Sequence, residues 1–155
     1  MNVGKLLDHL YIGGLSNATN VKQLRDIGIT HVINMAAGYC HTGSKFYDKS
    51  VKYMEIHAED DDGYDIMKHH NEVYEFIEDA RKSGGKAFIH CVMGVNRSGT
   101  LAVSYIMVHK HIGPISAARQ VKRTRQILLT NHTFQKQLIE FANTQRLLEL
   151  DENEI

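Results

Sequence analysis

Short apolar runs that alternate with helical patterns dominate the first 90 residues of the chain. The runs are typical of buried β-strands and cover residues 10–12, 31–35, 53–56 and 87–90. Residues 17–27 have helical spacing, with Gly28 as a stop signal. Asp65 is a candidate N-cap for a longer helix that ends at the Ser-Gly-Gly of residues 83–85. Strands that alternate with helices predict an α/β domain with a mostly parallel sheet.

After residue 97 the strand patterns stop and three helical patterns follow. Residues 100–110 are apolar nearly all round, which predicts a helix buried inside the domain. The Gly-Pro of residues 113–114 opens a helix over residues 115–124, and a last helix spans 131–150. Its apolar stripe consists of Phe134, Leu138, Phe141 and Leu148. We expect a central, mostly parallel sheet of four to five strands flanked by helices, with one domain over residues 1–150 and a solvated acidic tail over 151–155.

Composition and charge narrow the class of protein. The 155 residues are 43% hydrophobic, with 18 basic and 18 acidic side chains and one proline. These values describe one globular domain and exclude a disordered or disulfide-rich chain. A net charge of zero argues against a dedicated nucleic-acid binder. The chain has no apolar run long enough for a membrane and no signal-peptide pattern, so we expect no membrane association. Its two cysteines, Cys40 and Cys91, indicate free thiols and a cytoplasmic protein, with an additional nuclear pool as the alternative.

The most specific stretch, GGKAFIHCVMGVNRSGT, covers residues 84–100. Cys91 ends a predicted strand, and Arg97 begins a helix after five intervening residues. A loop of this length curls into a cup of backbone N–H groups, with Gly94 permitting an unusual conformation. Arg97 adds a planar fork that matches two phosphate oxygens. Because a helix N-terminus and a guanidinium both favour the thiolate form of Cys91, the pattern predicts a phosphocysteine enzyme. The residues expected to bind substrate are Val92, Met93, Gly94, Val95, Asn96 and Arg97.

The segment HCVMGVNRS, residues 90–98, resembles the H-C-x-x-G-x-x-R-S/T signature of the cysteine-dependent protein tyrosine phosphatases. Five further segments resemble the small atypical dual-specificity branch: LYIGG at 10–14, LRDIGITHVIN at 24–34, HAEDDDGYDI at 57–66, SYIM at 104–107 and NHTF at 131–134. The resemblance covers about residues 8–142. It implies the phosphatase fold, a bare catalytic domain and phosphorylated protein substrates, with no cofactor.

The resemblance also implies a catalytic acid in the loop after a strand, about thirty residues before the cysteine. The loop 57–66 contains several carboxylates, and Asp60 precedes Cys91 by 31 residues. We therefore expect Asp60 to be the acid, with Asp61 and Asp62 as alternatives. Ser98 matches the family hydroxyl that helps the cysteine leave, although it is also a normal helix-start residue.

Four further side chains have weaker signals. His90 is expected to be structural and to tune the cysteine. Asn131 resembles a bracing position of the family, or is simply the N-cap of the last helix. Arg125 is a candidate second anion contact. Cys40 is expected to be a partly buried loop thiol, and the alternative is a regulatory disulfide between Cys40 and Cys91.

The ten histidines are scattered without a metal-binding spacing, so we expect no metal. The neutral side chains of Val92, Met93 and Val95 disfavour an inositol phosphate as substrate. A chain of this size predicts a shallow pocket that admits phosphotyrosine, phosphoserine and phosphothreonine. Three alternatives remain. One is an RNA 5′-phosphatase of the same superfamily, for which G-V-N-R at 94–97 is the signal, and another is a catalytically silent phosphoprotein-binding module. The third is a sulfurtransferase, whose active loop also starts with cysteine, although the spacing to Arg97 fits phosphate better. The sequence makes no prediction of oligomeric state.

Overall fold

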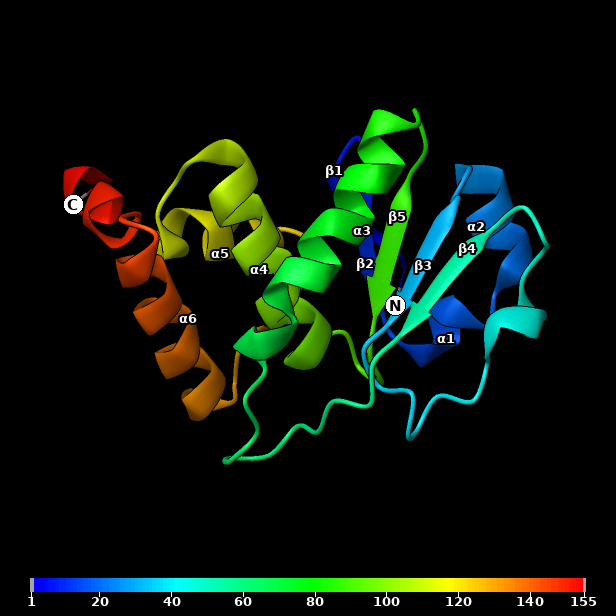
Figure 1. The fold of residues 1–155 in the computed structure, drawn as a ribbon, viewed down its shortest axis with the longest axis horizontal. Helices are drawn as coiled ribbons and strands as arrows, with labels where there is room; N and C mark the ends of the chain where they lie inside the picture. The colour runs from blue at the N-terminus through cyan, green and yellow to red at the C-terminus, as the bar shows by residue number, and fades with distance from the viewer. Residues whose placement is uncertain (1, 155) are drawn as a thin grey trace.

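A five-stranded sheet forms the centre of the fold, with the strand order β1-β2-β5-β3-β4 (Figure 1). The computed structural model describes the backbone of residues 2–154 and the side chains of residues 2–151. The strands are β1 (Gly4–Leu7), β2 (Leu10–Gly13), β3 (His31–Asn34), β4 (Lys52–Glu55) and β5 (Ala87–His90). All neighbouring pairs are parallel except β1 and β2, which confirms the predicted mostly parallel sheet. The sequence analysis missed β1, a short edge strand that joins β2 through a tight turn.

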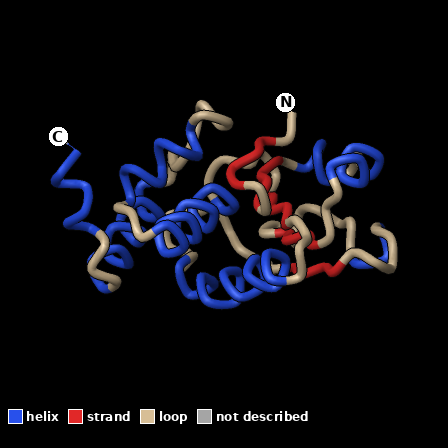
Figure 2. Tube along the Cα trace, turned by 90° about the horizontal axis from the view of Figure 1, so that it is seen from above, coloured by secondary structure: helices blue, strands red, loops and turns tan. Residues whose placement is uncertain are grey.

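Alternating residues of the strands point to opposite faces of the sheet and build two separate cores. Tyr11, Phe88 and Val32 are in register and pack against α1 (Leu15–Ala18) and α2 (Val21–Ile27). Their neighbours Ile12, Ile89 and Ile33 belong to the larger core on the other face. The helices of that face are α3 (His70–Lys82), α4 (Arg97–Lys110), α5 (Pro114–Lys122) and α6 (His132–Thr144). Figures 1 and 2 show the sheet between these two groups of helices.

The helix α4 is buried along most of its length. Every residue from Arg97 to Met107 is buried, which confirms the prediction of an internal helix, and α4 begins at Arg97 directly after the cysteine loop, as expected. It packs against β2, β5 and the other helices of its layer, so its N-terminus is fixed directly after β5. In the described part of the chain, no helix combines the length and apolarity needed to cross a bilayer.

Two predicted helices have different boundaries in the structure. The single helix expected over residues 17–27 is divided into α1 and α2, because Asn20 caps α2 by accepting a hydrogen bond from the Gln23 N–H. Asp65 is not the N-cap of α3. The neighbouring Ile66 is fully buried and its N–H donates to the Gln137 side chain, so Ile66 precedes the first turn in place of Asp65. It then forms a 3₁₀ turn, Met67–His69, before α3 begins.

The expected helix over 131–150 and solvated tail over 151–155 also need correction. Helix α6 ends at Thr144, and a 3₁₀ helix, η3, spans Leu148–Glu154. Asp151 is buried, and its carboxylate accepts from the N–H groups of Ile115 and Ser116 at 2.8 and 3.3 Å. The physical reason is the start of α5, where Gly113 offers no side-chain cap and the first N–H groups need an acceptor. The side chains of residues 152–155 lie outside the described part.

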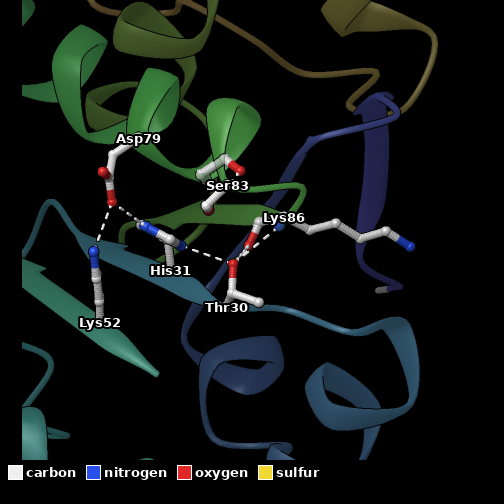
Figure 3. Close-up of polar contacts among 7 residues, drawn as sticks. Thr30, His31, Lys52, Asp79, Ser83 and Lys86 are labelled. Atoms are coloured by element: carbon white, nitrogen blue, oxygen red, sulfur yellow. Dashed lines mark hydrogen bonds and ion pairs between the residues drawn. The ribbon is translucent and has the colours of Figure 1, made fainter. Parts of the chain in front are cut away.

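A polar network fastens α3 to the amino-terminal ends of β3 and β4 (Figure 3). The Asp79 carboxylate of α3 binds His31 Nε2 at 2.7 Å and Lys52 Nζ at 2.9 Å. His31 Nδ1 in turn lies 2.7 Å from the Thr30 hydroxyl. The loops that carry the candidate chemistry lie at the opposite, carboxyl-terminal ends of the strands.

Candidate active site

Cys91 follows the central strand β5 and lies at the base of the loop that leads into α4. The side chain is 2% exposed, and its Sγ lies 3.1 Å from the hydroxyl oxygen of Ser98 in the first turn of α4. The structure thus brings together the two residues that the signature predicted as nucleophile and supporting hydroxyl. With Ser98 as donor, the bond would stabilise negative charge on sulfur.

The loop 91–97 is held tightly on both sides. Gly94 has φ +72°, and a Cβ there would lie 2.8 Å from the carbonyl oxygen of Gly13. This position therefore requires glycine for its conformation and for the close approach of the backbone. The Leu15 N–H donates to the Val92 carbonyl at 2.8 Å, and the Leu129 N–H to the Val95 carbonyl at 3.3 Å. These contacts fix the cup before any ligand binds.

Arg97 is buried although it begins the helix, with 7% of its surface exposed. One terminal nitrogen donates to the Ala58 carbonyl at 3.2 Å, and the Tyr39 ring centroid lies 5.2 Å from the guanidinium carbon. Its Nε is buried and has no protein partner among the described residues. A fixed guanidinium with an unused donor fits the predicted role of binding an oxyanion. The sequence analysis missed Tyr39, whose hydroxyl donates to Glu59 at 2.6 Å.

Asp60 is the carboxylate that the structure ties to the cysteine loop. Its Oδ2 accepts from Asn96 Nδ2 at 2.9 Å, and its Oδ1 from Asn131 Nδ2 at 3.0 Å. The carboxylate of Asp61 instead accepts from the Gly63 N–H within its own loop. Both Asp61 and Asp62 are exposed. The geometry favours Asp60 over its two alternatives.

Asn131 has both of the roles that the sequence left open. Its Oδ1 accepts from the N–H groups of Thr133 and Phe134 and so caps α6. Its Nδ2 donates to Asp60 and to the Asp61 carbonyl. Substrate binding by Asn96 stays a prediction, and its side chain joins Asp60 to the segment around Asn131. Nothing in the local sequence around Asn96 indicates this bridge.

Arg125 as a second anion contact stays a prediction, and its Nε is buried without a protein partner among the described residues. The guanidinium is 2% exposed and donates to the carbonyl oxygens of Asn2 and Ile12. Burial lowers the pKa of Arg125, against the opposing effect of Cys91. A Cβ on Gly94 would lie 3.2 Å from Arg125 Nε, so the Arg125 side chain packs directly against the cysteine loop.

His90 and Cys40 complete the buried surroundings of the nucleophile. His90 is fully buried, stacks on Phe88, and contacts the Cys91 carbonyl through Nδ1 at 3.3 Å. Burial lowers the pKa of His90 to about 4, which keeps the ring neutral and agrees with a structural role. Burial likewise raises the pKa of Cys40, and both cysteines are free thiols. Cys40 is more deeply buried than the sequence suggested, at 2% exposure.

Comparison with known proteins identifies the family. The model of the dual specificity phosphatase catalytic domain matches residues 10–144, and the chain belongs to this family. A dual specificity protein phosphatase of Dictyostelium discoideum, described as probable and rhodanese domain-containing, is 36% identical over 134 residues, which are 86% of this chain and 27% of that protein. Human dual specificity protein phosphatase 26 is 34% identical over 132 residues, 84% of this chain and 62% of its own. The chain thus matches only part of the length of these relatives.

A solved structure confirms the fold. The crystal structure of DUSP15 superimposes with a TM-score of 0.82 at 30% sequence identity, covering 99% of this chain and 96% of that one. The predicted phosphatase fold, with its mostly parallel sheet flanked by helices, is therefore correct.

Proposed function

We propose that the protein hydrolyses phosphomonoesters on tyrosine, serine and threonine side chains of proteins through a phosphocysteine intermediate. One observation carries the proposal. Cys91 Sγ lies 3.1 Å from the Ser98 hydroxyl at the base of a rigid loop that ends in the buried Arg97, whose Nε has no protein partner among the described residues. Membership of the dual specificity phosphatase family supports phosphoproteins as the substrate class.

In the first step, the Cys91 thiolate attacks phosphorus in line with the ester oxygen. The S–P bond forms, the P–O bond to the substrate breaks, and Asp60 gives its proton to the departing oxygen. The N–H groups of the loop and the Arg97 guanidinium hold the three remaining phosphoryl oxygens throughout.

In the second step, the Asp60 carboxylate takes a proton from water as that water attacks phosphorus. The S–P bond breaks and inorganic phosphate leaves. The Ser98 hydroxyl donates to the departing sulfur, so that cysteine leaves as a stabilised thiolate. Asp60 is suited to both steps because it is exposed to solvent yet held by two amides.

The rim of the cup supports a protein substrate rather than a polyanion. Met93 is 69% exposed within the loop, and Ile127 nearby is 66% exposed. Apolar side chains here favour the residues around a phosphorylated side chain. The exposed Arg123 lines the same pocket, whereas an RNA 5′ end would need a whole basic channel. Because Cys91 must stay a free thiol, we further propose that the protein works in a reducing compartment, the cytoplasm with or without the nucleus.

The test compares wild type with Cys91→Ser on an aryl phosphate and on peptides carrying phosphotyrosine or phosphothreonine, with reductant present. We expect Cys91→Ser to lower kcat by at least about 10³ while phosphopeptide binding persists. Wild-type turnover of a 5′-triphosphate RNA but not of phosphopeptides would replace the proposal with an RNA phosphatase. Phosphopeptide binding without turnover in wild type would replace it with a silent binding module.

A further inference from the structure

A second cluster of reactive side chains lies away from Cys91. His9 is in the turn between β1 and β2, Glu78 is on α3, and His109 is in the last turn of α4. One ligand atom from each of these residues lies within 4.8 Å of the other two. The two imidazole centroids are 5.1 Å apart, and His109 Nδ1 is 3.9 Å from Glu78 Oε2.

Tyr105 orients two members of this cluster. Its hydroxyl donates to Glu78 Oε2 at 2.7 Å, and it lies 2.8 Å from His9 Nε2. Since a phenol has one proton, the hydroxyl must accept from His9 Nε2–H. This places the lone pair of the neutral His9 ring on Nδ1. A ring held by a hydrogen bond through its other nitrogen is the usual arrangement for a metal-binding histidine.

The donor set of the cluster suits a cation. Glu78 accepts hydrogen bonds from Arg81 and from Tyr105, as a carboxylate does, and each imidazole can offer one ring nitrogen. A neutral imidazole and an ionised carboxylate are the forms that coordinate metals.

We propose that His9, Glu78 and His109 form a binding site for Zn²⁺ or a similar divalent transition-metal ion. Two histidines and a glutamate are a known zinc ligand set, and solvent can supply a fourth ligand because both histidines are partly exposed. Tetrahedral coordination at 2.0–2.1 Å requires ligand atoms about 3.4 Å apart. Rotation of the His109 ring can supply part of the necessary contraction, since the His9 ring is held by Tyr105. The spacing of the histidines along the sequence predicted no metal. It could not reveal this cluster, because the fold brings together residues a hundred positions apart.

Arg81 is the competitor for this site. It donates to both carboxylate oxygens of Glu78, at 2.8 and 2.9 Å. Its side chain is 41% exposed, so it can move into solvent as the metal binds. Occupation of the site therefore exchanges one cation for another at Glu78, and removal of Arg81 should strengthen metal binding.

The site would stabilise the fold rather than take part in the proposed hydrolysis. His109 follows Arg97 by twelve residues along α4, which corresponds to about 18 Å. The metal would join the β1–β2 turn to α3 and α4 at the end of the sheet opposite Cys91. The inference is thus independent of the proposed function.

The experiment uses the full chain with Cys91→Ser, because the thiolate itself would bind zinc. Calorimetric titration with Zn²⁺, thermal unfolding with and without Zn²⁺, and the visible absorption of bound Co²⁺ report on the site. We expect His9→Gln and His109→Gln each to weaken Zn²⁺ binding at least tenfold, and Arg81→Gln to strengthen it several-fold. The matched control is His111→Asn, an exposed neighbour whose φ of +55° asparagine tolerates, and it should bind like the parent.

Two results would overturn the proposal. One is the absence of Zn²⁺ binding in both the parent and Arg81→Gln. The other is equal affinity in His9→Gln, His109→Gln and His111→Asn, which would place the metal on other histidines. Circular dichroism checks that each variant is folded. If His9→Gln unfolds, His109→Gln alone tests the proposal. His9 is bonded to Tyr105 in the fold, whereas substitution of His109 breaks no hydrogen bond to Tyr105.

Discussion

The two loops that meet at the candidate active site are held in different ways. The cysteine loop, 91–97, joins β5 directly to α4, and its backbone carbonyls are bound by Leu15 and Leu129. The acid loop, 57–66, follows β4 at the edge of the sheet. Its Asp60 is held by side-chain amides from Asn96 and Asn131. The nucleophile is thus positioned by backbone, and the acid by two side chains from other parts of the chain.

This difference has a functional consequence. Changes in the cysteine loop remove groups that the reaction needs in both steps, and the surrounding backbone cannot replace them. Changes that loosen the acid loop leave phosphate binding intact and affect only proton transfer. We therefore expect the variants below to have effects that fall from the cysteine loop, through Asp60, to the amides that hold it.

Arg97→Lys should have the largest effect of the three variants. Lysine keeps the charge but loses the planar fork and the buried Nε donor, so we expect kcat on a phosphopeptide to fall by roughly 10³. Steady-state kinetics would measure the loss. The control is Arg25→Lys, an exposed position on α2 that should keep the wild-type rate. A wild-type rate in Arg97→Lys would show that charge alone is sufficient.

The sequence predicted the cysteine loop better than the acid loop. The cysteine loop is a contiguous motif between a strand and a helix, so Cys91, Ser98 and Arg97 could be placed from local pattern alone. Asp60 could be selected only through the family resemblance, because its two amide partners lie 36 and 71 residues away. The burial of Asp151 and the approach of His9 to His109 were not predictable, since they depend on how distant elements pack.

Asp60→Asn should have an intermediate effect that depends on the leaving group. Loss of the proton donor should lower kcat by roughly 10² on a phosphoserine peptide, and by much less on an activated aryl phosphate. Comparing the two substrates separates proton transfer from misplaced binding. Asp62→Asn is the matched control in the same loop, exposed and expected to be neutral. If Asp62→Asn shows the larger, substrate-dependent loss, the acid has been assigned to the wrong residue.

Asn131→Asp should have the smallest effect, and it tests how the amides control Asp60. Aspartate is as good an N-cap as asparagine, so α6 keeps its start and stability should change little. The new carboxylate, however, replaces a donor located 3.0 Å from Asp60 with a like charge. Like charges favour the protonated acid, so the basic limb of the rate profile should move to higher pH, with a change of about tenfold or less in kcat/KM at neutral pH.

The pH dependence of kcat/KM for wild type, Asn131→Asp and Asn131→Ala would measure this effect. Asn131→Ala removes both the cap and the amide donor, so it should cost about 1 kcal/mol of stability and move the limb upward by less than Asn131→Asp, because it removes a donor to the carboxylate without adding a like charge. An upward shift that is larger in Asn131→Asp than in Asn131→Ala would show that Asp60 is the titrating acid and that its neighbour sets its proton affinity. Superimposable profiles for wild type and Asn131→Asp would mean that the acid loop moves away from Asn131 before the proton is transferred. The contrast between a backbone-held nucleophile and a side-chain-held acid would then describe the resting enzyme but not its reaction.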